Sequence, residues 1–96
     1  MITKRTKDFV KELKAIAKEG RAEIIKTIAQ EGSININGLS KKLNMAQSGV
    51  SQDVQRLSNV GIVNTKRIKK ETYCTLNKAK MQQIGAGFQC LSEGYL

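Results

Sequence analysis

Apolar residues recur every three or four positions through the first third of the chain, which is the spacing of one face of an α-helix. The first run predicts a helix over residues 7–19, capped by Thr6 or Asp8 and ended by Gly20. Residues 21–31 repeat the pattern with three isoleucines. We therefore expect two amphipathic helices in direct succession, each with one buried stripe.

The helical spacing breaks at residues 33–36, where the β-branched run SINI predicts a short edge strand. Asn37 is then expected to cap a short helix that contains the sequence GLSKKL. A tight connection over residues 44–46 leads into a longer helix over residues 46–60, which stops at Gly61. A short helix, a brief turn and a longer helix are typical of a helix-turn-helix unit.

Two β-rich runs follow, over residues 62–68 and 72–76, and the three residues 69–71 between them predict a hairpin. Asn77 is expected to cap a last helix, although two glycines inside it lower its helix propensity. Its apolar positions, at a 3-4-3 spacing, are Met81, Ile84, Phe88 and Leu91. The predicted fold is mainly α with a small β-hairpin, in the order α-α-β-α-α-β-β-α of a winged helix-turn-helix.

The helix expected at residues 46–60 has an unusual polar face. Its apolar residues Val50, Val54 and Leu57 turn toward the core, so its other side carries mainly uncharged amides and hydroxyls. These side chains are Gln47, Ser48, Ser51, Gln52 and Gln55. Glutamine bonds adenine N6 and N7 together and serine donates or accepts, whereas charged side chains bind any phosphate. We interpret this face as one that reads base edges in DNA.

Positive charge is concentrated in the second half of the chain. The formal net charge is +9, and residues 41–80 hold nine Lys and Arg against two Asp and Glu, which favours a polyanionic partner. The residues expected to contact the DNA backbone are Lys41, Lys42 and Arg56 beside the reading helix, and Lys66, Arg67, Lys69 and Lys70 in the hairpin. The alternatives are lysines that maintain solubility or protect a sheet edge from aggregation.

Several function classes lack the residues that they need. The chain has no histidine and no Cys-x-x-Cys pair, so a transition metal has almost no ligands, and we expect no metal and no other cofactor. Nucleophile–histidine pairs are equally absent, so we expect no enzyme activity. No apolar run approaches the roughly 20 residues of a membrane span, and the N-terminal residues do not form a signal peptide. We expect a cytoplasmic protein.

Ninety-six residues suit one domain, spanning residues 1–96. A chain of this size buries only about two-thirds of its unfolded surface, so a dimer interface is a natural supplement to its core. Apolar stripes on both terminal helices exceed what one small core absorbs, which predicts a homodimer. The residues expected at the interface are Phe9, Leu13, Ile84, Phe88 and Leu91.

The two cysteines, Cys74 and Cys90, are the candidate redox residues. Cys74 is expected to face the core from the second hairpin strand as a small buried hydrophobe. Cys90 follows Asn77 by 13 positions, about 20 Å along a helix at 1.5 Å per residue. An intrachain disulfide needs Cα atoms within about 7 Å, so the last helix would have to break at residues 85–87. Thiol sensing between two subunits is the alternative.

Short sequence motifs lie in the predicted reading helix, directly after it, and at the end of the predicted hairpin. The reading helix carries Val-Ser-Gln at 50–52 and Leu57, Gly-Ile-Val follows at 61–63, and the hairpin ends in an aromatic-x-x-Leu-Asn motif at 73–77. With these motifs, residues 21–77 resemble the winged helix-turn-helix repressors of the ArsR type. The resemblance implies a homodimeric operator-binding regulator that pairs through its first and last helices. We expect a repressor that reads an inverted repeat.

The chain departs from that family at its ligand and cap positions. Metal-sensing members use cysteines on the third helix or histidines and carboxylates on the last helix, and this chain has GLSKKL and no histidine there. A metal-sensing role is therefore not implied. Asp53 stands where relatives often have histidine and Ala46 where a hydroxyl cap is common, which changes the expected cap and base contacts.

Three alternative functions remain beside a DNA-binding repressor. MarR-type regulators share the wing and are the close alternative. A winged-helix module that recruits a protein through Phe88 and Leu91 belongs to a different class. RNA binding is third, because four aromatic residues leave little for base stacking.

Overall fold

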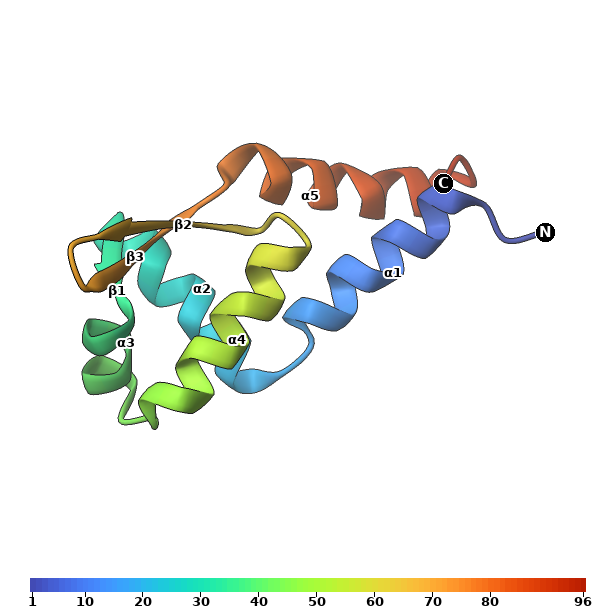
Figure 1. Cartoon of the computed structure of the whole chain (residues 1–96). Helices are drawn as coiled ribbons and strands as arrows, with labels where there is room; N and C mark the ends of the chain where they lie inside the picture. Colours follow the sequence, from blue (N-terminus) through green and yellow to red (C-terminus); the bar gives the residue numbers. More distant parts are fainter.

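The structure is a computed structural model that describes all 96 residues, and it has five helices and three strands (Figure 1). In chain order these are α1 (Lys4–Ile16), α2 (Glu19–Glu31), β1 (Ser33–Asn35), α3 (Ile36–Leu43), α4 (Gln47–Asn59), β2 (Val63–Ile68), β3 (Glu71–Leu76) and α5 (Lys78–Glu93). The predicted order α-α-β-α-α-β-β-α is confirmed, and the fold is a winged helix-turn-helix.

The first two helices begin earlier than their apolar pattern predicts. Thr3, and not Thr6 or Asp8, caps α1, because its side chain accepts a hydrogen bond from the Thr6 N–H at 3.2 Å. Gly20 does not end α1, since it lies in the first turn of α2. A Cβ on Gly20 would lie 3.2 Å from Met45 Cε, so glycine permits close packing of α2 against the α3–α4 connection.

Two further boundaries differ from the prediction by one or two residues. Asn35, and not Asn37, caps α3, because Asn35 Oδ1 accepts a hydrogen bond from the Gly38 N–H at 2.7 Å. The strand before it is correspondingly shorter than predicted. The hairpin turn contains two residues rather than three, because Glu71 pairs with Ile68 at the end of the β2–β3 ladder.

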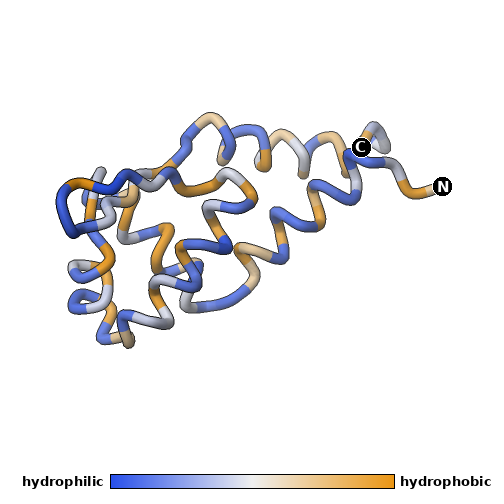
Figure 2. The backbone as a smooth tube through the Cα atoms, viewed as in Figure 1, coloured by the Kyte–Doolittle hydropathy of each residue, from blue (hydrophilic) through white to orange (hydrophobic).

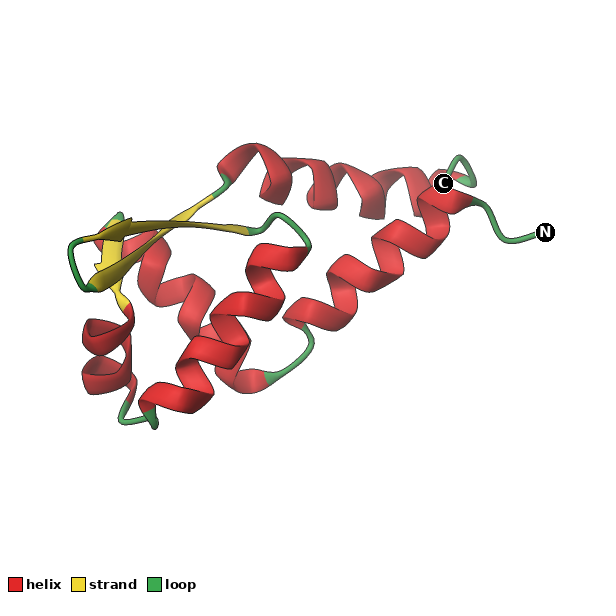
Figure 3. Ribbon diagram, in the orientation of Figure 1, coloured by secondary structure: helices red, strands yellow, loops and turns green.

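The three strands form one antiparallel sheet in the order β1-β3-β2 (Figure 3). Cys74 on β3 pairs with Ile34 on one side and Thr65 on the other, so these residues share a face. That face covers the helices, since Cys74 is fully buried and Val63 is 1% exposed. Beyond Val63 every β2 residue is exposed, so the hairpin extends from the body as a wing.

The core lies between the sheet and helices α2, α3 and α4. Its fully buried side chains are Ile24, Ile28, Leu39, Val50, Leu57, Ile62, Val63 and Cys74. Each large aliphatic side chain stabilises the fold by about 1.5–3 kcal/mol relative to its exposed state. No buried side-chain nitrogen or oxygen lacks a hydrogen-bond partner.

The last helix runs alongside α1, away from the sheet (Figure 1). Asn77 caps α5 as predicted, and the helix continues unbroken through Gly85 and Gly87. A Cβ on Gly87 would lie 2.6 Å from Phe9 Cε1, so this glycine provides room for the Phe9 ring. The Phe9 and Phe88 rings meet edge to face, with centroids 5.1 Å apart.

The molecule is elongated, with principal extents of 45 × 21 × 20 Å. The wing lies at one end, and α1, α5 and both chain ends form the other (Figure 1). No helix is long and apolar enough to span a membrane.

Candidate nucleic-acid interface

The predicted reading side chains all lie on the exposed face of α4. Val50 and Leu57 are fully buried and Val54 is 2% exposed, which fixes the rotation of the helix. That rotation exposes the five predicted side chains, Gln47, Ser48, Ser51, Gln52 and Gln55. The face therefore presents amides and hydroxyls to solvent on a helix that the core holds in place.

Hydrogen bonds within the chain orient some of these side chains and leave others free. Gln47 Nε2 donates to Asn37 Oδ1 on α3 at 2.7 Å, and Gln55 Nε2 donates to Asn59 Oδ1 at 2.9 Å. Gln52 makes no hydrogen bond to the protein, so its whole amide is available to a partner. Asn37, which the sequence pattern predicted to be a helix cap, is instead a residue that orients Gln47.

The start of α4 offers backbone donors. Its cap residue, Ala46, has no side-chain oxygen and makes no cap hydrogen bond. The N–H groups of the first turn thus have no side-chain acceptor, and the helix dipole places partial positive charge there. A phosphate oxygen is a suitable acceptor for these groups.

A polar groove of about 420 Å³ connects α4 to the wing. Its walls are formed by Gln47, Ser48 and Ser51 on one side and by Arg67, Lys70 and Thr72 on the other. Ile36 is the only hydrophobic residue that lines it. The groove therefore suits a polar, negatively charged partner rather than an apolar ligand.

The wing cations are exposed and face in different directions. In the β2–β3 register Arg67 is on the same sheet face as Val63, and its guanidinium donates to Thr72 Oγ1 at 3.4 Å. Lys66 alternates to the opposite face. Figure 2 shows that the end of the hairpin is mainly hydrophilic.

The turn at the wing tip keeps a lysine in an unfavourable conformation. Lys69 has a φ of 57°, in the left-handed region that costs a side-chain-bearing residue about 1–2 kcal/mol. Glycine or asparagine would fit this position with less strain. A cation at the tip is thus present at a conformational cost.

Most of the predicted backbone-contacting cations have no anionic partner in the chain. Lys42 is the exception, because its Nζ lies 2.7 Å from Glu31 Oε1. The exposed cations without an ion pair are Lys41, Arg56, Lys66, Arg67, Lys69 and Lys70. Their charge is available to a polyanion.

A buried ion pair holds the flank of α4 and was not anticipated from the sequence. Asp53 is 4% exposed, and its Oδ1 lies 3.2 Å from Arg21 Nη1 and 3.5 Å from Lys18 Nζ. Arg21 also donates to the carbonyls of Lys14 and Ala15 at the end of α1. Asp53 therefore positions α4 and does not lie on its exposed face. Its spacing to Val50 and Leu57 could have signalled a buried position.

The predicted dimer residues fall into two groups. Phe9 and Ile84 are 5% and 4% exposed, so they belong to the core of one chain, and Leu13 packs partly buried against that core. Phe88 and Leu91 are each 53% exposed. The surface available for pairing is therefore narrower than the sequence predicted, because α1 and α5 already cover much of their apolar stripes by packing together.

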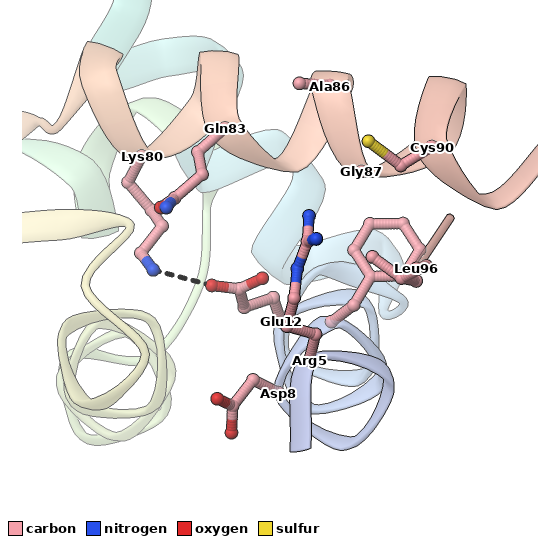
Figure 4. Close-up of a pocket in the computed structure, with 10 residues that line it drawn as sticks. Arg5, Asp8, Glu12, Lys80, Gln83, Ala86, Gly87, Cys90 and Leu96 are labelled. Carbon is pink, nitrogen blue, oxygen red and sulfur yellow. Dashed lines mark hydrogen bonds and ion pairs between the residues drawn. The ribbon is translucent and has the colours of Figure 1, made fainter. Parts of the chain in front are cut away.

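The cysteines lie in different surroundings, and both are free thiols. Burial in the sheet raises the pKa of Cys74 to about 11. Cys90 lines a cavity of about 230 Å³ between α1 and α5, beside Gly87 and Leu96 (Figure 4). Since α5 does not break at residues 85–87, the condition for an intrachain disulfide is not met. Figure 4 also shows the ion pair across this cavity, where Lys80 Nζ lies 2.6 Å from Glu12 Oε2.

The sequence of this chain matches a known protein family and a known transcriptional activator. The HVO_A0114 family model matches residues 16–77, which hold α2 to β3. The transcriptional activator HlyU of Vibrio cholerae is 29% identical over 72 residues, covering 75% of this chain and 66% of HlyU, just under two-thirds of its length.

Solved structures share the fold over nearly the whole chain. A structure of HlyU from Vibrio cholerae has a TM-score of 0.74 at 28% identity and covers 98% of both chains. An ArsR family transcriptional regulator has a TM-score of 0.80 at 17% identity, with 93% of this chain and 91% of its own covered. A homodimeric winged helix-turn-helix DNA-binding domain from Mycobacterium bovis has a TM-score of 0.73 at 21% identity, covering 94% and 82%. The resemblance to ArsR-type regulators is confirmed.

Proposed function

Because this chain belongs to the HVO_A0114 family and its relatives are transcriptional regulators, we propose that it is a homodimeric, sequence-specific DNA-binding regulator. The observation that carries the proposal is the exposed face of α4, which presents uncharged amides and hydroxyls between exposed cations. Base edges need such donors and acceptors, and phosphates need the cations.

In the proposed complex, α4 enters the major groove and the wing follows the neighbouring backbone. Gln52 is free to bond a base, and Gln47 is held ready by Asn37. Arg67 and Lys70 line the polar groove together with residues of α4, which supports a role in binding phosphates beside the bases that α4 reads. Two copies related by a two-fold axis would read an inverted repeat.

We propose repression by occupancy as the direct consequence of such binding, because a protein bound at a promoter excludes other proteins from it. HlyU of Vibrio cholerae carries the name of an activator. The position of the operator relative to the promoter decides between repression and activation. A promoter–reporter fusion measures which of the two occurs.

Replacement of Gln52 by Ala tests base reading. We expect a loss of about 1–3 kcal/mol on the preferred duplex and little change on a scrambled duplex, because only specific binding uses base edges. Gln30→Ala is the matched control, since Gln30 is an exposed glutamine on α2. Equal weakening on both duplexes would overturn the assignment of α4 as the reading helix.

The same assay tests the wing through Lys69→Asn with Lys70→Gln, where Asn keeps the left-handed turn accessible. We expect weaker binding to every sequence and a salt dependence of log affinity that is flatter by about 0.9 for each phosphate that the wing no longer neutralises. Discrimination between the two duplexes should remain. A weakening confined to the preferred duplex would contradict a backbone role for the wing.

Recruitment of another protein is the second candidate function. It is favoured by the exposure of Phe88 and Leu91, each 53% exposed on α5. The same surface serves a homodimer, so the oligomeric state in solution separates the two functions.

A further inference from the structure

A row of lysines lies on the solvent side of α1, outside the surface formed by α4 and the wing. Lys4, Lys7, Lys11 and Lys14, here called the lysine ridge, are all exposed and make no ion pair. At about 100° per residue they fall within an arc of about 80°, opposite the buried Phe9. Their ten-residue span is about 15 Å long.

The lysine ridge leads toward the reading helix. Just beyond its last member, Lys18 Nζ lies 3.5 Å from Asp53 Oδ1 on the flank of α4. The opposite flank of α4, at Gln47 and Ser51, forms the groove shared with the wing. Figure 1 accordingly shows α1 and the wing on opposite sides of α4. The exposed face of α4 thus has cations on both sides.

The surroundings of the lysine ridge favour a polyanion over two other partners. A basic amphipathic helix binds membranes through its apolar face, and that face of α1 is buried here, with Phe9 5% and Ala15 9% exposed. Lysine is depleted in protein–protein interfaces, which rely on aromatic anchors, and the ridge has none. Closely spaced cations that make no ion pair within the chain suit a phosphate backbone, and Asp8 is the one carboxylate beside the ridge that makes no ion pair.

We propose that the lysine ridge binds the DNA phosphate backbone on the side of α4 opposite the wing, so that each subunit holds the backbone at two places. This inference rests on the proposed function and names a third contacting element, α1, beside α4 and the wing. Lys7 and Lys11 at its centre carry the largest share of the binding, because they have ridge lysines on both sides.

The test compares two double variants that remove the same charge. Lys7→Gln with Lys11→Gln removes the centre of the ridge, and Lys26→Gln with Lys78→Gln removes exposed lysines of α2 and α5, which line neither the groove nor the wing. Affinity is measured on the duplex selected by the wild type and on a scrambled duplex, over a series of salt concentrations. Thermal unfolding establishes that both variants fold.

At 0.1 M salt the ridge variant should bind both duplexes about eightfold more weakly for each phosphate that it no longer neutralises, or about 60-fold more weakly for two phosphates. The slope of log affinity against log salt should then be flatter by about 1.8 for two phosphates. The control variant should change the slope by much less. In a further set of duplexes, one phosphate at a time is replaced by an uncharged methylphosphonate. At a phosphate that the ridge contacts, this replacement should weaken binding of the wild type but not of the ridge variant, which has already lost the contact.

Two outcomes separate this inference from the proposed function. If the wild type binds no duplex, the proposed function fails and the ridge proposal fails with it. If the wild type binds and the two variants lose affinity equally, the ridge proposal alone is overturned, and its lysines are a solvated face or a surface for an acidic protein.

Discussion

The role of Asp53 follows from the side of α4 on which it lies. An acidic residue on the reading face would repel phosphates, but this carboxylate is 4% exposed and pairs with Arg21. Arg21 in turn donates to two carbonyls at the end of α1. A buried charge is tolerated only when paired and hydrogen-bonded, and this network meets both conditions. The network ties α4 to the connection between α1 and α2.

Cys74 should be nearly inert toward alkylation in the native protein at pH 8. Burial raises its pKa from 9.0 to about 11, so its thiolate fraction is roughly a hundredfold smaller than that of an unfolded cysteine. Because the folded pKa is raised, the stability linked to this thiol is present below pH 9 and is lost as the pH rises toward 11. Peptide mass spectrometry after iodoacetamide treatment measures the reaction, with urea-unfolded protein as control. Native Cys74 reacting as fast as in urea would refute its burial.

The two glycines of α5 give a matched test of how that helix packs on α1. Gly87→Ala would place a Cβ 2.6 Å from Phe9 Cε1, while nothing lies within 4 Å of a Cβ on Gly85. Both changes gain the same helix propensity, about 1 kcal/mol. We expect Gly87→Ala to be less stable than Gly85→Ala by about 1–3 kcal/mol, because only the former overpacks the interface. Urea unfolding at one protein concentration measures the difference, and equal stabilities would contradict the packing of α5 on α1.

The existence and order of the elements were predictable because apolar periodicity reports the core directly. Val50, Val54 and Leu57 gave the rotation of α4 and therefore its exposed face. Element boundaries were less predictable, because they depend on local competition between caps. Asn35 and Asn37 are both suitable caps, but the ladder of β1 with β3 ends at Asn35, whose side chain accepts the Gly38 N–H.

The parts of the site that sequence reasoning missed depend on contacts between distant residues. Arg21 and Asp53 are 32 positions apart, and no local pattern joins them. The hydrogen bond by which Asn37 orients Gln47 across the α3–α4 turn was missed for the same reason, because it joins residues ten positions apart. The predicted dimer surface was too broad because intrachain packing of α1 on α5, which buries Phe9 and Ile84, could not be inferred from two separate stripes.

The large exposed apolar side chains of the molecule gather mainly at the end formed by α1 and α5. The wing and α4 carry one group of unpaired cations and the lysine ridge of α1 carries another, while Phe88, Leu91, Val10 and Tyr95 are exposed on or beside α1 and α5. Phe88 and Leu91 on α5 therefore lie apart from the exposed face of α4 and from the wing. Two-fold pairing there would set two copies of α4 about 34 Å apart, one turn of DNA.

Leu91→Glu should shift the protein from dimer toward monomer. Leu91 is 53% exposed in one chain, and a charge at the centre of an interface costs more than about 1.4 kcal/mol, so the dimer dissociation constant should rise at least about tenfold. Analytical ultracentrifugation over a range of concentrations measures it. Ile68→Glu is the control, since Ile68 is 45% exposed but lies on the wing. A wild type that is only monomeric at micromolar concentration would favour recruitment of another protein through Phe88 and Leu91.

Selection of bound sequences from random duplex DNA tests whether α4 reads DNA as one half of a symmetric pair. We predict enrichment of an inverted repeat whose half-sites are centred about one helical turn apart, since both copies of α4 read the same bases. Recovery of a single unrepeated motif would retain base reading but remove the dimer. Failure to enrich any sequence, with uniform weak binding to all duplexes, would contradict the assignment of Gln47, Ser48, Ser51, Gln52 and Gln55 as a reading face.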